Sequence, residues 1–96
     1  MAFGGAKGIS GEVRRGGRLV ATLGRWEATR DRAADTWSIA AGVTERHPVW
    51  AQDGPHEVVL HVGDGGWRWR GAEVAFQGDA SAVITARGRF ESLRGT

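Results

Sequence analysis

The chain has 96 residues, of which 41% are hydrophobic and 25% charged, and these values are typical of a folded domain and exclude wholesale disorder. Thirteen lysine and arginine residues against eleven acidic residues give a formal charge of +2, too weak a field to indicate a nucleic-acid-binding protein by itself. The absence of cysteine excludes disulfide bonds and thiolate metal sites, and the sixteen glycines indicate many turns and bulges between short strands.

The start of the chain carries no targeting signal that we recognise. It lacks the apolar run of about 7 to 15 residues that marks a signal peptide, and no run of about 20 apolar residues follows anywhere. We therefore expect a soluble protein made in the cytoplasm. Residues 1–8 contain three glycines and no apolar period, which predicts a flexible arm.

A first hairpin is predicted next. Ile9, Gly11 and Val13 fall at every second position, Leu19, Ala21 and Leu23 do so again, and residues 14–17 between them have turn chemistry. Gly24 then shifts the phase, so that Trp26 continues the alternation on even numbers. This shift predicts a β-bulge at Gly24.

The middle of the chain contains one clear strand and one long loop. Residues 29–35 are polar and could hold a single helical turn, too short to be stable alone. Residues 35–43 show the cleanest alternation and predict a strand. Residues 44–55 lose the pattern and contain both prolines, which predicts a loop of the length that often contacts another molecule.

Residues 57–76 carry the strongest strand signal, a hairpin with Asp-Gly and Gly-Gly pairs at 63–66. In its second strand Trp67 and Trp69 share one face, and the arginines between and after them take the other. Gly71 reverses the phase, which predicts a second bulge. A last strand is expected within 80–90, and a frayed tail over 91–96.

About six short strands separated by turn residues predict an all-β fold, a small antiparallel barrel or sandwich with a long loop and flexible termini. The chain is then a single β domain over 9–90, with an arm at 1–8 and a tail at 91–96. Barrel and sandwich produce the same strand pattern, so both remain open at this point.

No residue pattern indicates catalysis or metal binding. His56 and His61 lie five positions apart on one predicted strand, hence on opposite faces, and neither they nor His47 have nearby residues that complete a ligand set. No serine lies in a nucleophile elbow, and residues 4–8 lack the Gly-Lys-Ser/Thr ending of a phosphate loop. We therefore expect no enzyme activity, no metal and no cofactor.

The five tryptophans are the strongest compositional signal. Trp37, with either Trp67 or Trp69, is expected in the core. Trp50 lies in the predicted loop, where an aromatic residue either contacts a partner or caps a barrel. The candidate partner interface consists of His47, Val49, Trp50 and Trp26.

Four arginines form a candidate basic face if the last strands are neighbours: Arg68, Arg70, Arg87 and Arg89. Beside aromatic side chains they would suit single-stranded nucleic acid. Glu57, Asp64 and Glu73 lie among the same strands, and cross-strand ion pairs are an ordinary way to solvate a sheet. The salt-bridged face is the favoured interpretation.

The order of features in residues 11–26 and 37–41 carries a resemblance. Gly11-Glu12-Val13, a glycine-rich turn, Leu19 to Trp26 and then Trp37-Ser38-Ile39-Ala40-Ala41 resemble the openings of small all-β proteins of long-tailed bacteriophage tails and baseplates. The resemblance covers about the first half of the chain. It implies a non-enzymatic virion subunit, made in the host cytoplasm, that joins copies of itself and other virion proteins by strand addition and an ordered arm. The alternative hypothesis is a nucleic-acid-binding β-barrel that uses the basic face.

Overall fold

The structure, a computed structural model, describes residues 5–47, 55–78 and 80–93. These residues form eight β-strands, and none of them belongs to a helix that could cross a membrane. The strands are β1 (Gly5–Gly8), β2 (Gly11–Arg15), β3 (Arg18–Asp31), β4 (Thr36–Arg46), β5 (His56–Val62), β6 (Gly65–Gln77), β7 (Ser81–Arg87) and β8 (Glu91–Leu93).

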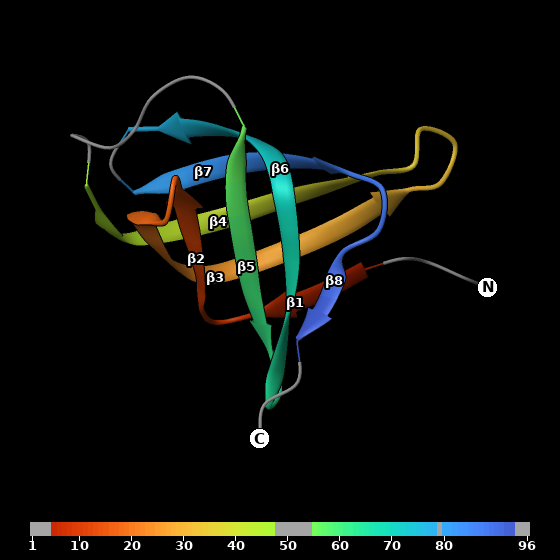
Figure 1. The fold of residues 1–96 in the computed structure, drawn as a ribbon, viewed down its shortest axis with the longest axis horizontal. Helices are drawn as coiled ribbons and strands as arrows, with labels where there is room; N and C mark the ends of the chain where they lie inside the picture. The colour runs from red at the N-terminus through yellow and green to blue at the C-terminus, as the bar shows by residue number, and fades with distance from the viewer. Residues whose placement is uncertain (1–4, 48–54, 79, 94–96) are drawn as a thin grey trace.

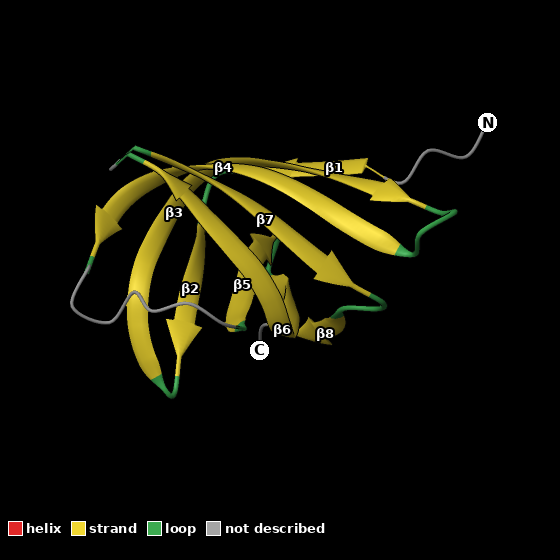
Figure 2. Ribbon diagram, turned by 90° about the horizontal axis from the view of Figure 1, so that it is seen from above, coloured by secondary structure: helices red, strands yellow, loops and turns green. Residues whose placement is uncertain are grey.

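Six of the strands close an antiparallel barrel in the order β3-β2-β5-β6-β7-β4, with β4 pairing back onto β3 (Figure 1). The all-β prediction is confirmed, and because the sheet closes on itself the fold is a barrel and not a sandwich. Strand β1 adds to the second half of β3, and β8 adds to the first half of β6. Figure 2 shows that these two extra strands lie on opposite sides of the barrel.

Both predicted bulges are present and keep the apolar residues inside. On β3, Gly24 and Arg25 together lie opposite Gly42 of β4, because Leu23 pairs with Val43 and Trp26 with Ala41. On β6, residues 70 and 71 lie opposite Glu57 in the same way. Each extra residue reverses the alternation, so that the strand bends and continues to bury its apolar face.

Two tight turns give the hairpins their register. Residues Gly16 and Gly17, with φ of 58° and 79°, join β2 to β3, and Gly63, with φ of 56°, begins the two-residue turn between β5 and β6. Positive φ is accessible to glycine without steric cost, and primed turns of this kind match the twist of paired strands. The predicted hairpins at 9–23 and 57–76 are confirmed.

The interior of the barrel is apolar and rich in indole rings. Trp26, Trp37 and Trp69 are 1%, 8% and 3% exposed, whereas Trp67 is half-buried and stacks on Phe90 with ring centroids 4.3 Å apart. The prediction that Trp37 and one of the paired tryptophans lie in the core is confirmed, and both paired indoles point inward. The fully buried aliphatic side chains around them are Val13, Val20, Leu23, Ile39, Val58, Leu60 and Ile84.

Several segment boundaries differ from the sequence prediction. Half of the predicted flexible arm is strand β1, and the first residues of the predicted frayed tail are β8. Residues 29–35 contain no helical turn: β3 continues to Asp31, whose carboxylate accepts hydrogen bonds from the amides of Ala33 and Ala34 in a tight turn. Strand β4 extends to Arg46, and residues 48–54 of the predicted loop lie outside the described residues.

Ile9 is also placed differently from the sequence prediction. Alternation put it on the core face with Gly11 and Val13, but its side chain is 79% exposed. The reason is a break between β1 and β2 at Ser10, whose carbonyl accepts hydrogen bonds from the Trp26 indole at 2.9 Å and from the His61 amide at 3.0 Å. The phase of the first hairpin therefore begins at Gly11.

Candidate docking surface beside strand β1

Two of the four residues of the predicted partner interface, His47 and Trp26, lie in the described structure. Val49 and Trp50 lie outside the described residues. His47, at the end of β4, contacts the Glu45 carboxylate through Nε2 at 2.7 Å, and its amide donates to the Val20 carbonyl. Trp26 belongs to the core and is 1% exposed, with Gly8 of β1 against its indole.

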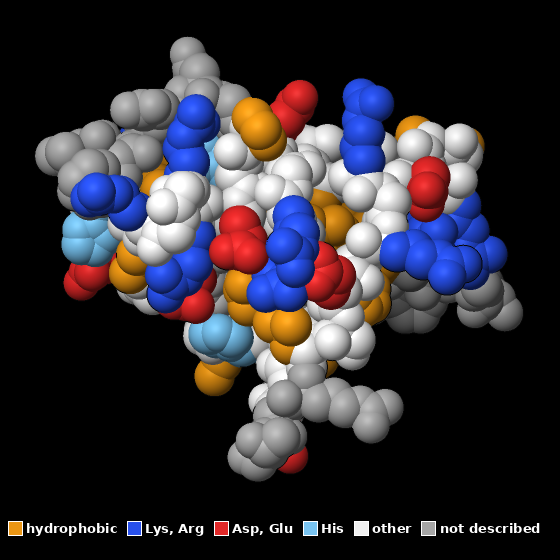
Figure 3. All heavy atoms as spheres, in the orientation of Figure 1, with side chains coloured by type: hydrophobic (Ala, Val, Ile, Leu, Met, Phe, Trp, Pro, Cys, Tyr) orange, Lys and Arg blue, Asp and Glu red, His pale blue; other side chains and the backbone are white. Residues whose placement is uncertain are grey.

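The predicted basic face is salt-bridged where β6 meets β8. Arg68 Nη2 lies 2.7 Å from Glu91 Oε2, and Arg70 Nε lies 2.5 Å from Glu91 Oε1. Glu57 of β5 approaches Arg68 Nε at 3.8 Å. Figure 3 shows arginine and acidic side chains interspersed over β5 and β6, so this face carries both signs of charge.

These contacts change the acidity of the groups involved. Hydrogen bonds from Arg70 and then Arg68 lower the pKa of the Glu91 carboxyl to about 2. The hydrogen bond to Glu91 also raises the pKa of Arg70. Glu91 therefore stays ionised at neutral pH and ties the short strand β8 to β6.

Arg87 and Arg89 lie apart from that cluster. Arg87 ends β7, opposite Thr36 of β4, and Arg89 follows in the connection to β8. Both are exposed, and neither makes an ion pair with another residue that the structure describes. Of the four arginines of the predicted basic face, Arg68 and Arg70 are thus paired with Glu91, whereas Arg87 and Arg89 make no ion pair with a described residue.

The histidines do not form a ligand cluster. His56 is 2% exposed inside the barrel and His61 is exposed outside, as their spacing predicted. Within the described ranges, no three histidine or acidic residues lie close enough to hold a metal ion. His61 Nδ1 instead pairs with Ser10 Oγ at 2.8 Å and helps to fix the junction between β1 and β2.

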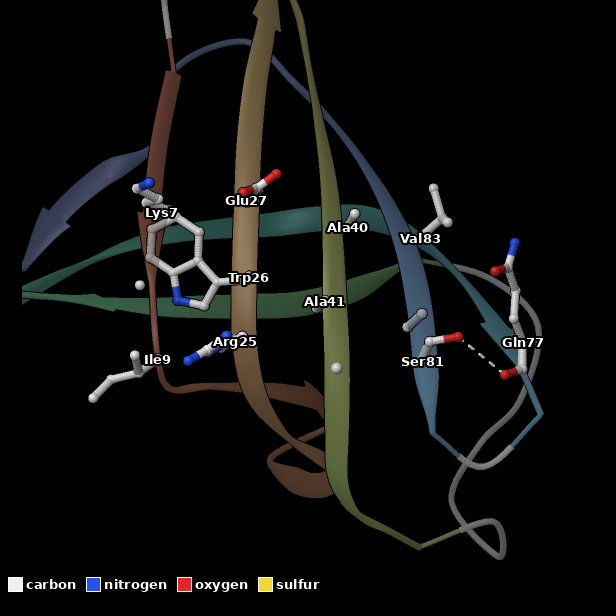
Figure 4. A pocket seen from close by; sticks show the side chains of 13 residues that line it. Lys7, Ile9, Arg25, Trp26, Glu27, Ala40, Ala41, Gln77, Ser81 and Val83 are labelled. Carbon is white, nitrogen blue, oxygen red and sulfur yellow. Dashed lines mark hydrogen bonds between the residues drawn. The ribbon is translucent and has the colours of Figure 1, made fainter.

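A groove of about 790 Å³ crosses the outer face of β1, β3, β4 and β7 (Figure 4). Its central row follows the strand register from Lys7 to Glu27, Ala40 and Val83. The small side chain of Ala40 and the absence of one at Gly42 leave the middle of the sheet hollow. The bulge at Gly24 and Arg25 bends β3 beside the hollow.

The β1 end of the groove carries exposed apolar and charged side chains. Ile9 is the only large hydrophobic residue that is exposed in the described part of the chain. Figure 4 shows Arg25 and Ile9 together on this side, with Gln77 and Ser81 across the groove. Lys7, Arg25 and Glu27 make no ion pair with any described residue, so their charges are available for recognition.

Strand β1 also presents an open edge. In the described ranges it pairs only with β3, so its second row of amides and carbonyls has no strand partner. An unpaired edge is a template for another strand. We define the β1 docking surface as this edge together with Lys7, Ile9, Arg25 and Glu27.

The sequence pattern missed this surface. Four residues with two glycines, Gly5–Gly8, are too short and too poor in side chains to show a strand period. A single isoleucine gives no signal of exposure when it continues an alternating run. The unusual feature that could have been noticed is the Ile9-Ser10 pair, because a polar residue there permits the strand to break.

Comparison of the chain with protein-family models, with curated proteins and with solved structures finds no match.

Proposed function

We propose that this protein is a non-enzymatic structural subunit of a tailed-phage virion, in a tail, baseplate or related assembly, and that it acts by joining copies of itself and other virion proteins. The observation that carries the assembly function is the β1 docking surface. There, an exposed isoleucine, unpaired charges and an open strand edge border one groove. Each feature occurs singly on ordinary surfaces, but their combination favours a protein partner.

The virion setting is supported by the resemblance of the sequence around the first hairpin. The residues that carry the resemblance lie in β2, in the Gly16-Gly17 turn and in the part of β3 up to Trp26, although β3 itself continues to Asp31. A chain of this size hides only about 60 to 65% of its unfolded surface. Association would add apolar burial to this small core.

A nucleic-acid function has weaker support. Two of the four arginines proposed for it are neutralised by Glu91, and Glu57 adds a further negative charge beside Arg68. Free phosphate would have to compete with a carboxylate that already forms charge-assisted hydrogen bonds. Of these four arginines, only Arg87 and Arg89 make no ion pair with a residue that the structure describes.

Hydrogen exchange as a function of protein concentration tests the assembly function. We expect the amides of residues 5–9 to exchange more slowly at high micromolar concentration than at low micromolar concentration, because the docking surface is then covered. Amides of β5 provide the internal control, since β5 is paired on both edges and should not respond. Equal exchange at both concentrations in residues 5–9 would count against the proposal.

A further inference from the structure

Strand β1 pairs with a part of β3 that we call the β3 seat, and the Trp26 indole determines which residues fit there. Gly8 pairs with Trp26, and a Cβ atom placed on Gly8 would lie 2.6 Å from Trp26 Cζ2. The backbone of β1 therefore lies directly on the indole and covers it, which leaves Trp26 1% exposed. Only a strand with glycine at this position can occupy the seat without displacing the ring.

Ser10, two residues after the end of β1, is held by residues of β3 and β5. Its carbonyl accepts hydrogen bonds from the Trp26 indole and the His61 amide, and its hydroxyl pairs with His61. None of these contacts involves a residue of β1. Ile9 is therefore the one residue between this anchor and the strand.

Ile9 is the connecting residue between Ser10 and β1, and we call it the hinge. Its large apolar side chain is exposed. Ile9 connects the anchored Ser10 to the four-residue strand β1, and it is 79% exposed at the rim of the groove. Strand β1 is paired on one edge only, and of its side chains Ala6 packs against the core while Lys7 is exposed. The six-strand closure does not include β1, but Trp26 needs a strand in this place to stay covered.

We propose that β1 is an exchanged strand, in which β1 of one copy occupies the β3 seat over Trp26 of a second copy. This inference rests on the proposed assembly function and names its partner and its joint. Every β1 to β3 contact of the single chain is kept in the exchanged form, which is why exchange of identical elements costs little. The extended hinge adds a new contact, because Ile9 then lies between the two copies, where its side chain leaves water.

Cysteine pairing in the full chain tests the exchange, and the natural absence of cysteine makes the result clean. Lys7 and Glu27 are direct partners across β1 and β3. Two single variants, Lys7→Cys and Glu27→Cys, are mixed in urea, refolded together and mildly oxidised. The two substitutions change the chain mass by nearly the same amount, so one variant is uniformly labelled with ¹⁵N. Mass spectrometry then separates the mixed disulfide from the two symmetric ones.

Exchange predicts that the mixed disulfide dominates. Antiparallel partners lie within the Cα distance of about 4.4 to 6.8 Å that a disulfide needs, so pairing should give about tenfold more mixed product than collision does. The control mixture is Glu12→Cys with Thr22→Cys, which are partners inside the barrel between β2 and β3. That mixture should give only the collisional level.

A third substitution identifies which strand is donated. Adding Gly8→Ala to the Lys7→Cys chain should reduce the mixed disulfide to the control level, because the donated strand no longer fits over Trp26. Adding it to the Glu27→Cys chain should reduce the yield less, since the disulfide between positions 7 and 27 uses that chain's β3 and not its β1.

A mixed disulfide at the control level overturns the exchange. If light scattering still finds an oligomer of the unsubstituted chain in that case, only the joint is wrong and the assembly function stands. If the unsubstituted chain is a monomer, the assembly function fails as well.

Discussion

At the scale of single residues, Gly8 and Ile9 of the β1 docking surface differ in the space that surrounds their side-chain positions. Gly8 has no space for a side chain because the Trp26 indole lies beneath it. Ile9, the next residue, has a large apolar side chain with almost no contact. The first residue limits which strand fits on β3, and the second is the residue that would contact a neighbouring molecule in the proposed assembly.

Substitution of Ile9 should weaken association and leave the fold intact. Burial of an isoleucine side chain contributes about 1.5 to 3 kcal/mol, so Ile9→Asp should weaken self-association by about tenfold to a hundredfold. The free energy of unfolding of the monomer should change by less than about 0.5 kcal/mol, because the side chain is exposed. Sedimentation and urea unfolding measure the two quantities.

The matched control for this substitution is Ala33→Asp, in the exposed turn between β3 and β4, far from the groove residues. It adds the same charge and should not alter association. An Ile9→Asp protein that associates as strongly as the unsubstituted chain would remove Ile9 from the docking surface.

Gly8→Ala should release β1 from its seat. The added methyl group would contact the indole at 2.6 Å, and overpacking of this kind typically costs about 1 to 3 kcal/mol. We expect the Trp26 indole proton to shift and to exchange faster in NMR spectra. Gly71→Ala is the control, because the nearest atom to its Cβ position is 4.0 Å away and its backbone has no positive φ.

At the scale of elements, β8 is a strand held mainly by charge. It has three residues, pairs with residues 66–68 of β6, and carries Glu91 between Arg68 and Arg70. The connection before it places Phe90 on Trp67, where it covers one end of the aromatic interior. The ion pairs thereby help to hold Phe90 against Trp67, although exposed ion pairs add little to the free energy of unfolding.

The acidity of Glu91 tests this arrangement. Its pKa is lowered from an ordinary value of 4.5 to about 2, so its contribution is fully present above about pH 4.5 and is lost as the pH falls through 2. An NMR titration of the Glu91 carboxyl carbon should therefore have a midpoint near 2. In Arg70→Gln the midpoint should rise toward 4.5, because the strongest hydrogen bond is gone.

Arg89→Gln is the control for this titration, since Arg89 makes no ion pair with a described residue. Its midpoint should stay near 2. A Glu91 midpoint near 4.5 in the unsubstituted protein would show that β8 is not held by these arginines.

The elements that the sequence predicted are those whose signal is local. Alternation gave the two hairpins, and a change of phase at Gly24 and Gly71 gave both bulges, because one extra residue necessarily reverses the inward face. Strand β1 forms because β3 is long enough to pair with two strands along one side, and β8 forms because β6 is long in the same way. These pairings are tertiary contacts, so the four residues of β1 and the three of β8 carry no local signal for them.

The candidate site was less predictable for the same reason. The groove joins residues from positions 7 to 83, and its hollow comes from small side chains that neighbour each other only through strand register. The salt-bridged interpretation of Arg68 and Arg70 agrees with the structure, but the decisive acid, Glu91, lies in the tail that was expected to fray. The predicted interface residues Val49 and Trp50 remain a prediction.

At the scale of the whole molecule, the barrel depends on a small aromatic core. Trp37 contacts the rings of Trp67, Trp69 and Phe90 at centroid distances of 5.6 to 6.0 Å. Removal of such a ring typically costs about 3 to 5 kcal/mol, which is a large part of the stability of a small domain.

Comparison of two tryptophan substitutions tests this dependence. Trp37→Ala should lower the free energy of unfolding by about 3 to 5 kcal/mol in a urea titration. Trp67→Ala should cost less, because Trp67 is only half-buried. Equal losses would indicate that the aromatic interior is not centred on Trp37.

The central claim is that this barrel exists to assemble, and the solution mass of the unsubstituted protein tests it most directly. Light scattering over a range of protein and salt concentrations should find a discrete oligomer whose mass is a fixed multiple of the chain mass. The oligomer should persist in high salt, because the β1 docking surface combines strand pairing and an apolar contact with its charges. A folded monomer at every concentration would contradict the account.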